Sequence, residues 1–190
     1  MLHSFLTSGG RPQTTLTNIV PNNNFANTTG WEATAATLAA DSNILSVTGN
    51  GTNALLYTND ANIGIRVLGM TYYGRVKARV TNSSCTKLRL VVAGGGIYDI
   101  NSPAANQWYD MSVNRAATGS GNSVISVQAY YADAATANGK VAQVQESIVL
   151  DLTARFGSGV EPTAAQVKRW LDIFSASWFV STKLIPKRIY

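Results

Sequence analysis

The sequence predicts an all-β fold in which two antiparallel sheets pack as a β-sandwich, with one short amphipathic α-helix near the C-terminus. Apolar and polar residues alternate with a period of two along much of the chain, and turn residues separate these segments at regular intervals. Only 13% of the residues are charged, while 45% are hydrophobic. This composition is typical of sandwiches whose outer faces are neutral and polar, and 190 residues suffice for one buried core.

Seven segments carry the strand pattern. Val76, Ala78 and Val80, for example, alternate with basic residues, so one face of that strand is apolar and the other is charged. The joints hold turn residues such as Gly94-Gly95-Gly96 and Asn138-Gly139. Seven or eight strands at such spacing are typical of a two-sheet sandwich. The expected strands are residues 43–49, 54–58, 74–81, 87–93, 108–114, 123–131 and 143–152.

The spacing of the apolar residues changes from strand-like to helix-like after a strand that we expect to end at Asp151. A turn at Gly157-Ser158-Gly159 follows, and Pro162 stands just before a new pattern. Thr163 is a good N-cap, and Gln166, three residues later, can return a hydrogen bond to the N–H of the cap residue. This capping box predicts that a helix begins here.

The predicted helix has one apolar stripe at the spacing i, i+3, i+4 and i+7, on about three turns. Its charged face should stay in water while the stripe packs on a sheet. Trp170, and Trp178 beyond the stripe, are expected in the core or at the seam with the sandwich rather than stacked on a ligand. The stripe consists of Val167, Trp170, Leu171 and Phe174, and the charged face of Lys168, Arg169 and Asp172.

The chain divides into four parts. Residues 1–15, with breakers at Gly9-Gly10 and Pro12, form an N-terminal arm, and residues 16–156 form the sandwich. Residues 157–180 form the turn and helix packed on it, and residues 181–190 form a basic tail.

Charge and cysteine content restrict the function classes. The net charge is +5, and basic residues alternate along two expected strands, which favours a solvated outer face or a subunit contact over nucleic-acid binding. No apolar run approaches the roughly 18 residues of a membrane span, and the start of the chain has no signal-peptide pattern. Cys85 is alone, so we expect no intrachain disulfide and folding in a reducing cytosol.

The sequence offers few side chains from which a catalytic site could be built. The only histidine, His3, lies in the expected arm, so a Ser-His-Asp or Cys-His arrangement is not expected in the folded region. The glycine turns do not continue into a phosphate-binding Gly-Lys-Ser/Thr, and no spacing pairs two carboxylates as a glycosidase needs. We therefore expect a protein that is not an enzyme and holds no cofactor.

The segment DLTARFGSGVEPTAAQVKRW, followed by SWF, resembles a segment that recurs in tail and minor structural proteins of bacteriophages. Val160 stands where that family commonly has a polar residue such as Asn. In those proteins the segment usually closes a jelly roll that is similar to a carbohydrate-binding module. The resemblance therefore implies that the sandwich is a jelly roll.

The opening LTNIVPNNNFANTTGW is similar to the first strand and turn of family 4, 9 and 22 carbohydrate-binding modules, with the pattern held by Asn18, Asn22, Phe25, Gly30 and Trp31. The resemblance makes Asp151 a calcium candidate, because it stands where those modules have a late Asp ligand. Ala26 replaces their Glu ligand, so we expect no tightly bound calcium.

The sequence offers more residues that could bind a sugar. Aromatic rings stack on pyranoses, and polar side chains bind the hydroxyl groups. Each of the pairs Tyr72-Tyr73, Trp108-Tyr109 and Tyr130-Tyr131 should place one ring inside and one outside. The alternative explanation is that such residues pack under loops at sheet edges. The candidates are Tyr98, Tyr109, Tyr130 and one of Tyr72 and Tyr73, with Tyr72 chosen, and Asp99, Asn101 and Gln128 as polar partners.

The basic tail can either dangle or dock on a neighbouring subunit or virion protein. Its candidate contact residues are Leu184, Ile185, Lys187, Arg188, Ile189 and Tyr190.

The expected function is that of a non-enzymatic bacteriophage structural protein of the tail, baseplate or particle surface, which binds host-surface glycans. One alternative is a structural capsid-decoration or tail-assembly protein without sugar binding, and another is the accessory module of a glycan-degrading enzyme. The expected partners are other virion proteins, further copies in a homo-oligomer and a host polysaccharide, without nucleic acid or membrane. The expected location is the virion, assembled in the bacterial cytoplasm.

Overall fold

The computed structural model describes residues 7–8, 11–20, 24–60, 66–173 and 182–186. Its two large sheets are antiparallel and have five strands each. The first sheet has the order β10 (Tyr109–Ala116), β7 (Thr71–Val80), β12 (Val141–Asp151), β5 (Ile44–Gly49) and β4 (Ala36–Asp41). The second has the order β3 (Trp31–Thr34), β6 (Leu55–Asp60), β11 (Ile125–Tyr130), β8 (Lys87–Val92) and β9 (Gly96–Asn101).

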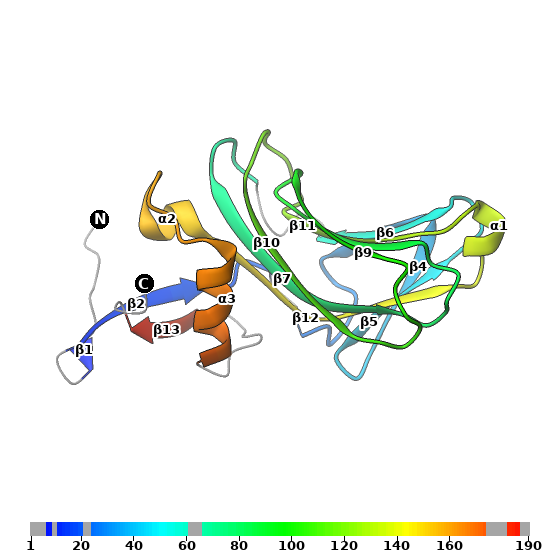
Figure 1. The fold of residues 1–190 in the computed structure, drawn as a ribbon, viewed down its shortest axis with the longest axis horizontal. Coiled ribbons are helices and arrows are strands. Elements are labelled where there is room, and N and C mark those ends of the chain that lie inside the picture. The colour runs from blue at the N-terminus through cyan, green and yellow to red at the C-terminus, as the bar shows by residue number, and fades with distance from the viewer. Residues whose placement is uncertain (1–6, 9–10, 21–23, 61–65, 174–181, 187–190) are drawn as a thin grey trace.

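The remaining elements lie around this sandwich. A three-stranded sheet contains β1 (Thr7–Ser8), β2 (Arg11–Thr17) and β13 (Thr182–Pro186). It lies with α2 (Leu152–Phe156) and α3 (Ala164–Ile173) at one end of the molecule, and α1 (Ala134–Ala137) lies at the other end (Figure 1). In the described part of the chain, no helix is long and apolar enough to cross a membrane.

The core of the sandwich forms between the two sheets, as the period-two pattern requires. Val76, Ala78 and Val80 of β7 are buried in it, and so are Leu88, Leu90 and Val92 of β8. The basic residues that alternate with them point to the outer faces. Together with the short C-terminal helix, this arrangement confirms the predicted jelly-roll sandwich.

Sequence reasoning missed three strands of the sandwich, namely β3, β4 and β9. All three lie at sheet edges, where one side of the strand has no neighbour among the strands that the structure describes. The residues of β4, ATLAAD, are mostly small and only partly buried, so their alternation is weak. Edge strands bury little side-chain area, and their sequences consequently carry a weaker pattern than those of inner strands.

A β-bulge in β12 lets this strand contribute to two cores. Ala142 and Val144 point into the sandwich, but the register shifts between Gln145 and Ile148, and Glu146 has a φ of 54°. The extra residue changes which face the following side chains occupy. Val149 therefore points into the sandwich core, whereas Ile148 points to the outer face and belongs to a second cluster.

Asn18 stabilises the backbone beside this bulge. Its side-chain oxygen accepts a hydrogen bond from the N–H of Val149 at 2.9 Å, and its Nδ2 donates to the carbonyl of Ser147 at 3.1 Å. Asn18 is itself buried. Because these backbone groups lie where the strand ladder is interrupted, the amide supplies partners that the ladder does not.

The second cluster, here called the helix core, lies on the outer face of the first sheet and is covered by α3. The predicted capping box is present, because the Thr163 N–H donates to Gln166 Oε1 at 2.8 Å and the Gln166 N–H donates to Thr163 Oγ1 at 3.3 Å. Phe174 and Trp178 lie outside the described residues. The helix core consists of Leu16, Tyr73, Ile148, Leu150, Leu152, Val167, Trp170 and Leu171.

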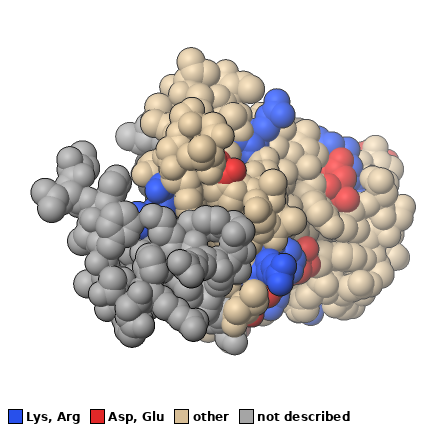
Figure 2. Space-filling view, turned by 60° about the vertical axis from the view of Figure 1, so that its left-hand side comes forward, with Lys and Arg blue, Asp and Glu red and all other residues tan. Residues whose placement is uncertain are grey.

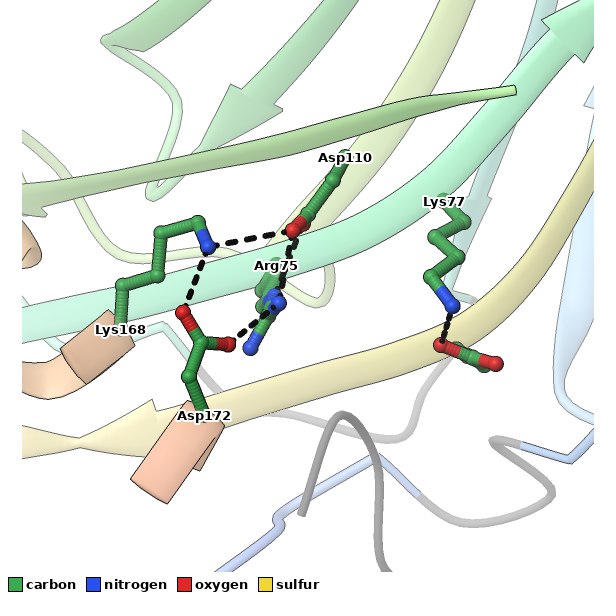
Figure 3. Close-up of polar contacts among 6 residues, drawn as sticks. Arg75, Lys77, Asp110, Lys168 and Asp172 are labelled. Carbon is green, nitrogen blue, oxygen red and sulfur yellow. Dashed lines mark hydrogen bonds and ion pairs between the residues drawn. The ribbon is translucent and has the colours of Figure 1, made fainter. Parts of the chain in front are cut away.

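The charged side of α3 stays accessible to water, as expected, but it also contacts the sheet. Arg75 of β7 forms two hydrogen bonds with Asp110 of β10, at 2.8 and 2.7 Å, and an ion pair with Asp172 of α3 at 2.9 Å. Lys168 lies 2.8 Å from Asp172 and 3.3 Å from Asp110 (Figure 3). The Arg75 side chain is only 5% exposed, so this four-residue network fixes the helix on the sheet.

The expected arm and tail lie side by side in the three-stranded sheet. Strand β13 pairs antiparallel with β2, so that Leu184 lies opposite Thr15 and Ile185 opposite Thr14. Residues 182–186 therefore have a strand partner within the chain and do not dangle, while docking of the tail on a neighbouring subunit or virion protein stays a prediction. Lys187, Arg188, Ile189 and Tyr190 lie outside the described residues.

We expect Trp170→Ala to lower the free energy of unfolding by about 3–5 kcal/mol, because the indole is fully buried in the helix core. Urea denaturation measures this change. Ile173→Ala is the matched control on the same helix, since Ile173 is 53% exposed, and it should cost less than about 1 kcal/mol. Equal losses in the two variants would contradict the packing described here.

We expect Asp110→Asn to cost about 1.5–3 kcal/mol at pH 7, the range for hydrogen bonds to charged groups. Burial raises the pKa of Asp110, but hydrogen bonds from Arg75 and the charges of Arg75 and Lys168 outweigh it, so the pKa lies below its ordinary value. The stabilisation is thus complete above the unfolded pKa of about 3.9 and is lost as the pH falls through the folded pKa.

Urea denaturation of wild type and Asp110→Asn across this pH range should show the difference shrinking toward low pH. Asp41→Asn is the control, because Asp41 lies exposed at the edge strand β4 of the same sheet. A difference that stays constant from pH 7 to pH 2 would show that the carboxylate charge does not contribute.

Candidate functional site

The outer face of the second sheet brings together four of the residues predicted to bind a glycan. On β11, Gln128 and Tyr130 point outward, since the residues between and beside them are buried in the sandwich core. Gln128 lies opposite Arg89 of β8, which in turn lies opposite Asp99 of β9. Tyr130 lies opposite Lys87, which lies opposite Asn101. The cross-strand register therefore places Asp99, Asn101, Gln128 and Tyr130 on one face.

A chain of hydrogen bonds orders the polar groups of this face. Arg89 donates from Nε and Nη2 to the two carboxylate oxygens of Asp99, at 2.7 and 2.8 Å. Its Nη1 reaches the Tyr130 hydroxyl at 3.4 Å, and that hydroxyl donates to Gln128 Oε1 at 2.6 Å. The hydrogen bonds from Arg89 lower the pKa of Asp99, so its carboxylate is charged at neutral pH. The hydrogen bond from the Tyr130 hydroxyl to Oε1 fixes the direction of the Gln128 amide.

The ring of Tyr130 is partly covered by cations. Lys87 Nζ lies 4.2 Å from the ring centroid and Arg89 Cζ lies 5.4 Å from it. Both distances are within the range of cation–π interactions. Tyr130 is therefore better suited to orient Gln128 through its hydroxyl than to serve as the open stacking platform that the sequence predicted.

A pocket of about 360 Å³ lies beside Gln128 on the same face. Tyr57 of β6 lies directly opposite Gln128 and supplies an aromatic ring. The other polar groups of the lining come from Arg66, Asn122, Ser123, Ser126 and Gln128. The volume and the mixture of one aromatic side chain with several hydrogen-bonding groups are typical of small-ligand sites.

Arg66 reaches this pocket from the segment that follows β6. Its backbone forms a two-way bridge with Gly121, with N–H to carbonyl distances of 2.8 and 3.0 Å. Its Nε donates to the carbonyl of Gly119 at 2.9 Å. The guanidinium is therefore held in place by main-chain groups.

The other predicted residues do not join this face. Tyr98 lies on β9 but points to the side opposite Asp99, where it faces Leu90 across the ladder. Tyr109 belongs to the first sheet, and its hydroxyl accepts a hydrogen bond from the N–H of Ala104 at 2.8 Å.

Neither Tyr72 nor Tyr73 is exposed, which corrects the expectation that one of them faces outward. Tyr72 is 1% exposed and points into the sandwich core, whereas Tyr73 is 0% exposed and points into the helix core. Burial raises the pKa of Tyr73 above its ordinary value. The alternation of the two rings is as predicted, but α3 covers the outer face of this part of the sheet, so both sides of β7 are buried.

Sequence reasoning missed Tyr57, Ser126 and Arg66. The first two had a signal, because Tyr57 alternates with the buried Leu56 and Thr58, and Ser126 shares the parity of Gln128. Arg66 had none, since it follows no strand pattern and its partners Gly119 and Gly121 lie far away in the sequence.

The calcium candidate Asp151 has a different contact. Its carboxylate accepts a hydrogen bond from the N–H of Ala154 at 2.8 Å and is the N-cap of α2. Within the described ranges, no group of three or more His, Cys, Asp or Glu side chains is arranged to hold a metal ion.

Four basic side chains of the described residues lie beside acidic ones. Arg75, Lys77, Arg89 and Lys168 each have a carboxylate within ion-pair distance. Figure 2 likewise shows charges of both signs next to one another on an otherwise largely uncharged surface.

The sequence matches no protein-family model and no curated protein. Among solved structures, the chain is similar to an arabinose-bound GH51 α-L-arabinofuranosidase, with 16% identity and a TM-score of 0.54 over 76% of this chain. It is also matched by a family 16 carbohydrate-binding module, with 12% identity and a TM-score of 0.46 over 70% of this chain and 99% of that one. A third match is the enzymatically active domain of bacteriophage CBA120 tailspike protein 4, with 15% identity and a TM-score of 0.47 over 70% of this chain.

The match spans 27% of the arabinofuranosidase chain and 21% of the tailspike chain. At this level of identity, the likeness to the arabinofuranosidase shows a shared fold alone. The sandwich of this chain is thus a fold that also occurs within a glycosidase.

Proposed function

We propose that this chain is a non-enzymatic carbohydrate-binding module and that its glycan binds on the outer face of the second sheet. The observation that carries the proposal is the pocket between Tyr57, Arg66 and Gln128, beside the ordered network of Tyr130, Arg89 and Asp99. Aromatic, amide, hydroxyl and guanidinium groups are the groups with which proteins bind sugars.

The network prepares Gln128 for recognition. Because Oε1 accepts the Tyr130 hydroxyl, the amide is oriented, and Nε2 makes no hydrogen bond with the residues that the structure describes. The two N–H groups of Gln128 Nε2 are thus held in a fixed direction, so little side-chain entropy is lost when a ligand binds them. The strands beneath are inner strands of a five-stranded sheet, which keeps the donors in a rigid frame.

The chain is proposed to act on a bacteriophage particle, at the tail, the baseplate or another surface position. The resemblance of the segment that begins at Asp151 to phage tail proteins supports this location. Many copies on one particle would convert a weak affinity for a host polysaccharide into strong attachment. Other virion proteins and further copies of this chain are the proposed partners.

We expect Tyr57→Ala and Gln128→Ala each to weaken glycan binding about tenfold, which corresponds to about 1.4 kcal/mol of lost ring and amide contacts. Binding of the labelled protein, clustered to restore avidity, to intact host cells and to their purified surface polysaccharides measures the effect. Thr37→Ala is the control, because Thr37 lies exposed on β4 in the other sheet.

The outcomes separate the three hypotheses. Undiminished binding in both variants would move the site away from this face. Absence of binding by the clustered wild type, together with stoichiometric incorporation into particles, would support a purely structural protein. A catalytic domain encoded beside this chain would support the accessory module of a glycan-degrading enzyme.

A further inference from the structure

We propose that the pocket on the second sheet binds an anionic substituent of its ligand, and that the glycan is therefore a carboxylate-bearing polysaccharide recognised by Arg66. This inference rests on the proposed function, since it specifies the sugar class that the same site takes.

The first observation is the charge of the pocket. Among its lining residues there is no Asp or Glu, and Arg66 is the only one with a charged side chain. A pocket that carries one positive charge and no negative charge favours an anionic ligand group over a neutral one.

The second observation is that Arg66, unlike Arg75 and Arg89, holds no carboxylate of the described residues. Arg75 and Arg89 each hold a carboxylate through two hydrogen bonds. Arg66 has no carboxylate within ion-pair distance in the described part of the chain, and its hydrogen bond is made by Nε to a main-chain carbonyl. The two Nη groups are left to form the charge-assisted hydrogen bonds that guanidinium groups make with carboxylates.

The third observation is that the position of the guanidinium depends on two glycines. A Cβ atom on Gly94 would lie 2.2 Å from Arg66 Nη1, and one on Gly121 would lie 2.9 Å from Nη2. Both distances are too short for real contacts, so any larger residue would displace the guanidinium. The two glycines thus leave the space that the guanidinium occupies.

The neighbouring groups suit the rest of an acidic sugar. Asn122, Ser126 and Gln128 line the same pocket and can hydrogen-bond to hydroxyl groups, while Tyr57 offers its ring. A carboxylate matches the planar geometry of the guanidinium, and the adjacent hydroxyl groups of a uronic acid would reach these polar side chains.

The test compares acidic oligosaccharides with neutral counterparts that differ only in the carboxyl group. Fragments of oligogalacturonate, alginate and hyaluronan, and the same fragments after carboxyl reduction, are titrated into the full chain at 150 mM salt by calorimetry. We expect at least one acidic fragment to bind tenfold or more tightly than its reduced form. Addition of 10 mM inorganic phosphate or sulfate tests whether the pocket prefers a bare inorganic anion to the sugar carboxylate.

Three variants assign the preference to Arg66. Arg66→Gln should reduce it to about onefold, and Arg169→Gln, which removes the same charge on α3, should leave it unchanged. Gly121→Ala keeps the net charge but pushes Nη2 of Arg66 aside, and it should weaken the preference. Thermal unfolding of each variant shows whether the fold is retained.

Each result bears on the inference. Equal binding of acidic and reduced fragments, with both lost in Tyr57→Ala, would overturn it while leaving the glycan-binding function intact. A preference that persists in Arg66→Gln would overturn it in favour of general attraction by the net positive charge. Complete displacement by phosphate or sulfate would show an inorganic-anion site and overturn the inference. Absence of binding to every fragment would also overturn it, whereas the binding to host cells tests the glycan-binding function separately.

Discussion

The architecture depends on the β-bulge in β12. Without the register shift between Gln145 and Ile148, every second side chain of β12, starting from Ala142, would point to the sandwich core along the whole strand. The shift turns Val149 inward and Ile148 outward, so that one strand stabilises both the sandwich core and the helix core. Asn18 supplies hydrogen bonds to the interrupted backbone at this point. The bulge is thus what allows α3 to pack on the outer face of the first sheet.

The packing of α3 makes the outer faces of the two sheets different. On the first sheet, the helix core and the network around Arg75 occupy the surface, and Asp110 and Asp172 neutralise the buried guanidinium. On the second sheet, the outer face carries ordered polar groups beside a pocket. Arginine has a different function on each face, because Arg75 fastens a helix while Arg66 is held by main-chain atoms at the pocket. Recognition is therefore proposed on the face that the helix does not cover.

The candidate site combines rigid support with few polar groups. Gln128 and Tyr130 stand on an inner strand whose opposite side is buried, so their backbone positions are fixed by the core. Arg89 and Asp99 then fix the side chains through hydrogen bonds across the strands. Such preorganisation lowers the entropy lost on binding. A shallow site of this kind suits a protein displayed in many copies, where avidity supplements the affinity of each site.

The sequence by itself determined the sandwich class, the inward faces of β7, β8 and β11, the end of β12 at Asp151 and the capping box of α3. Each of these follows from local periodicity or from residues a few positions apart. Tertiary structure alone decided that both Tyr72 and Tyr73 are buried, because alternation defines the two faces of a strand but not what covers each face. It also decided the pairing of β2 with β13 and the contact of Arg66 with Gly94, Gly119 and Gly121. These features join segments far apart in the chain, whose register no local pattern encodes.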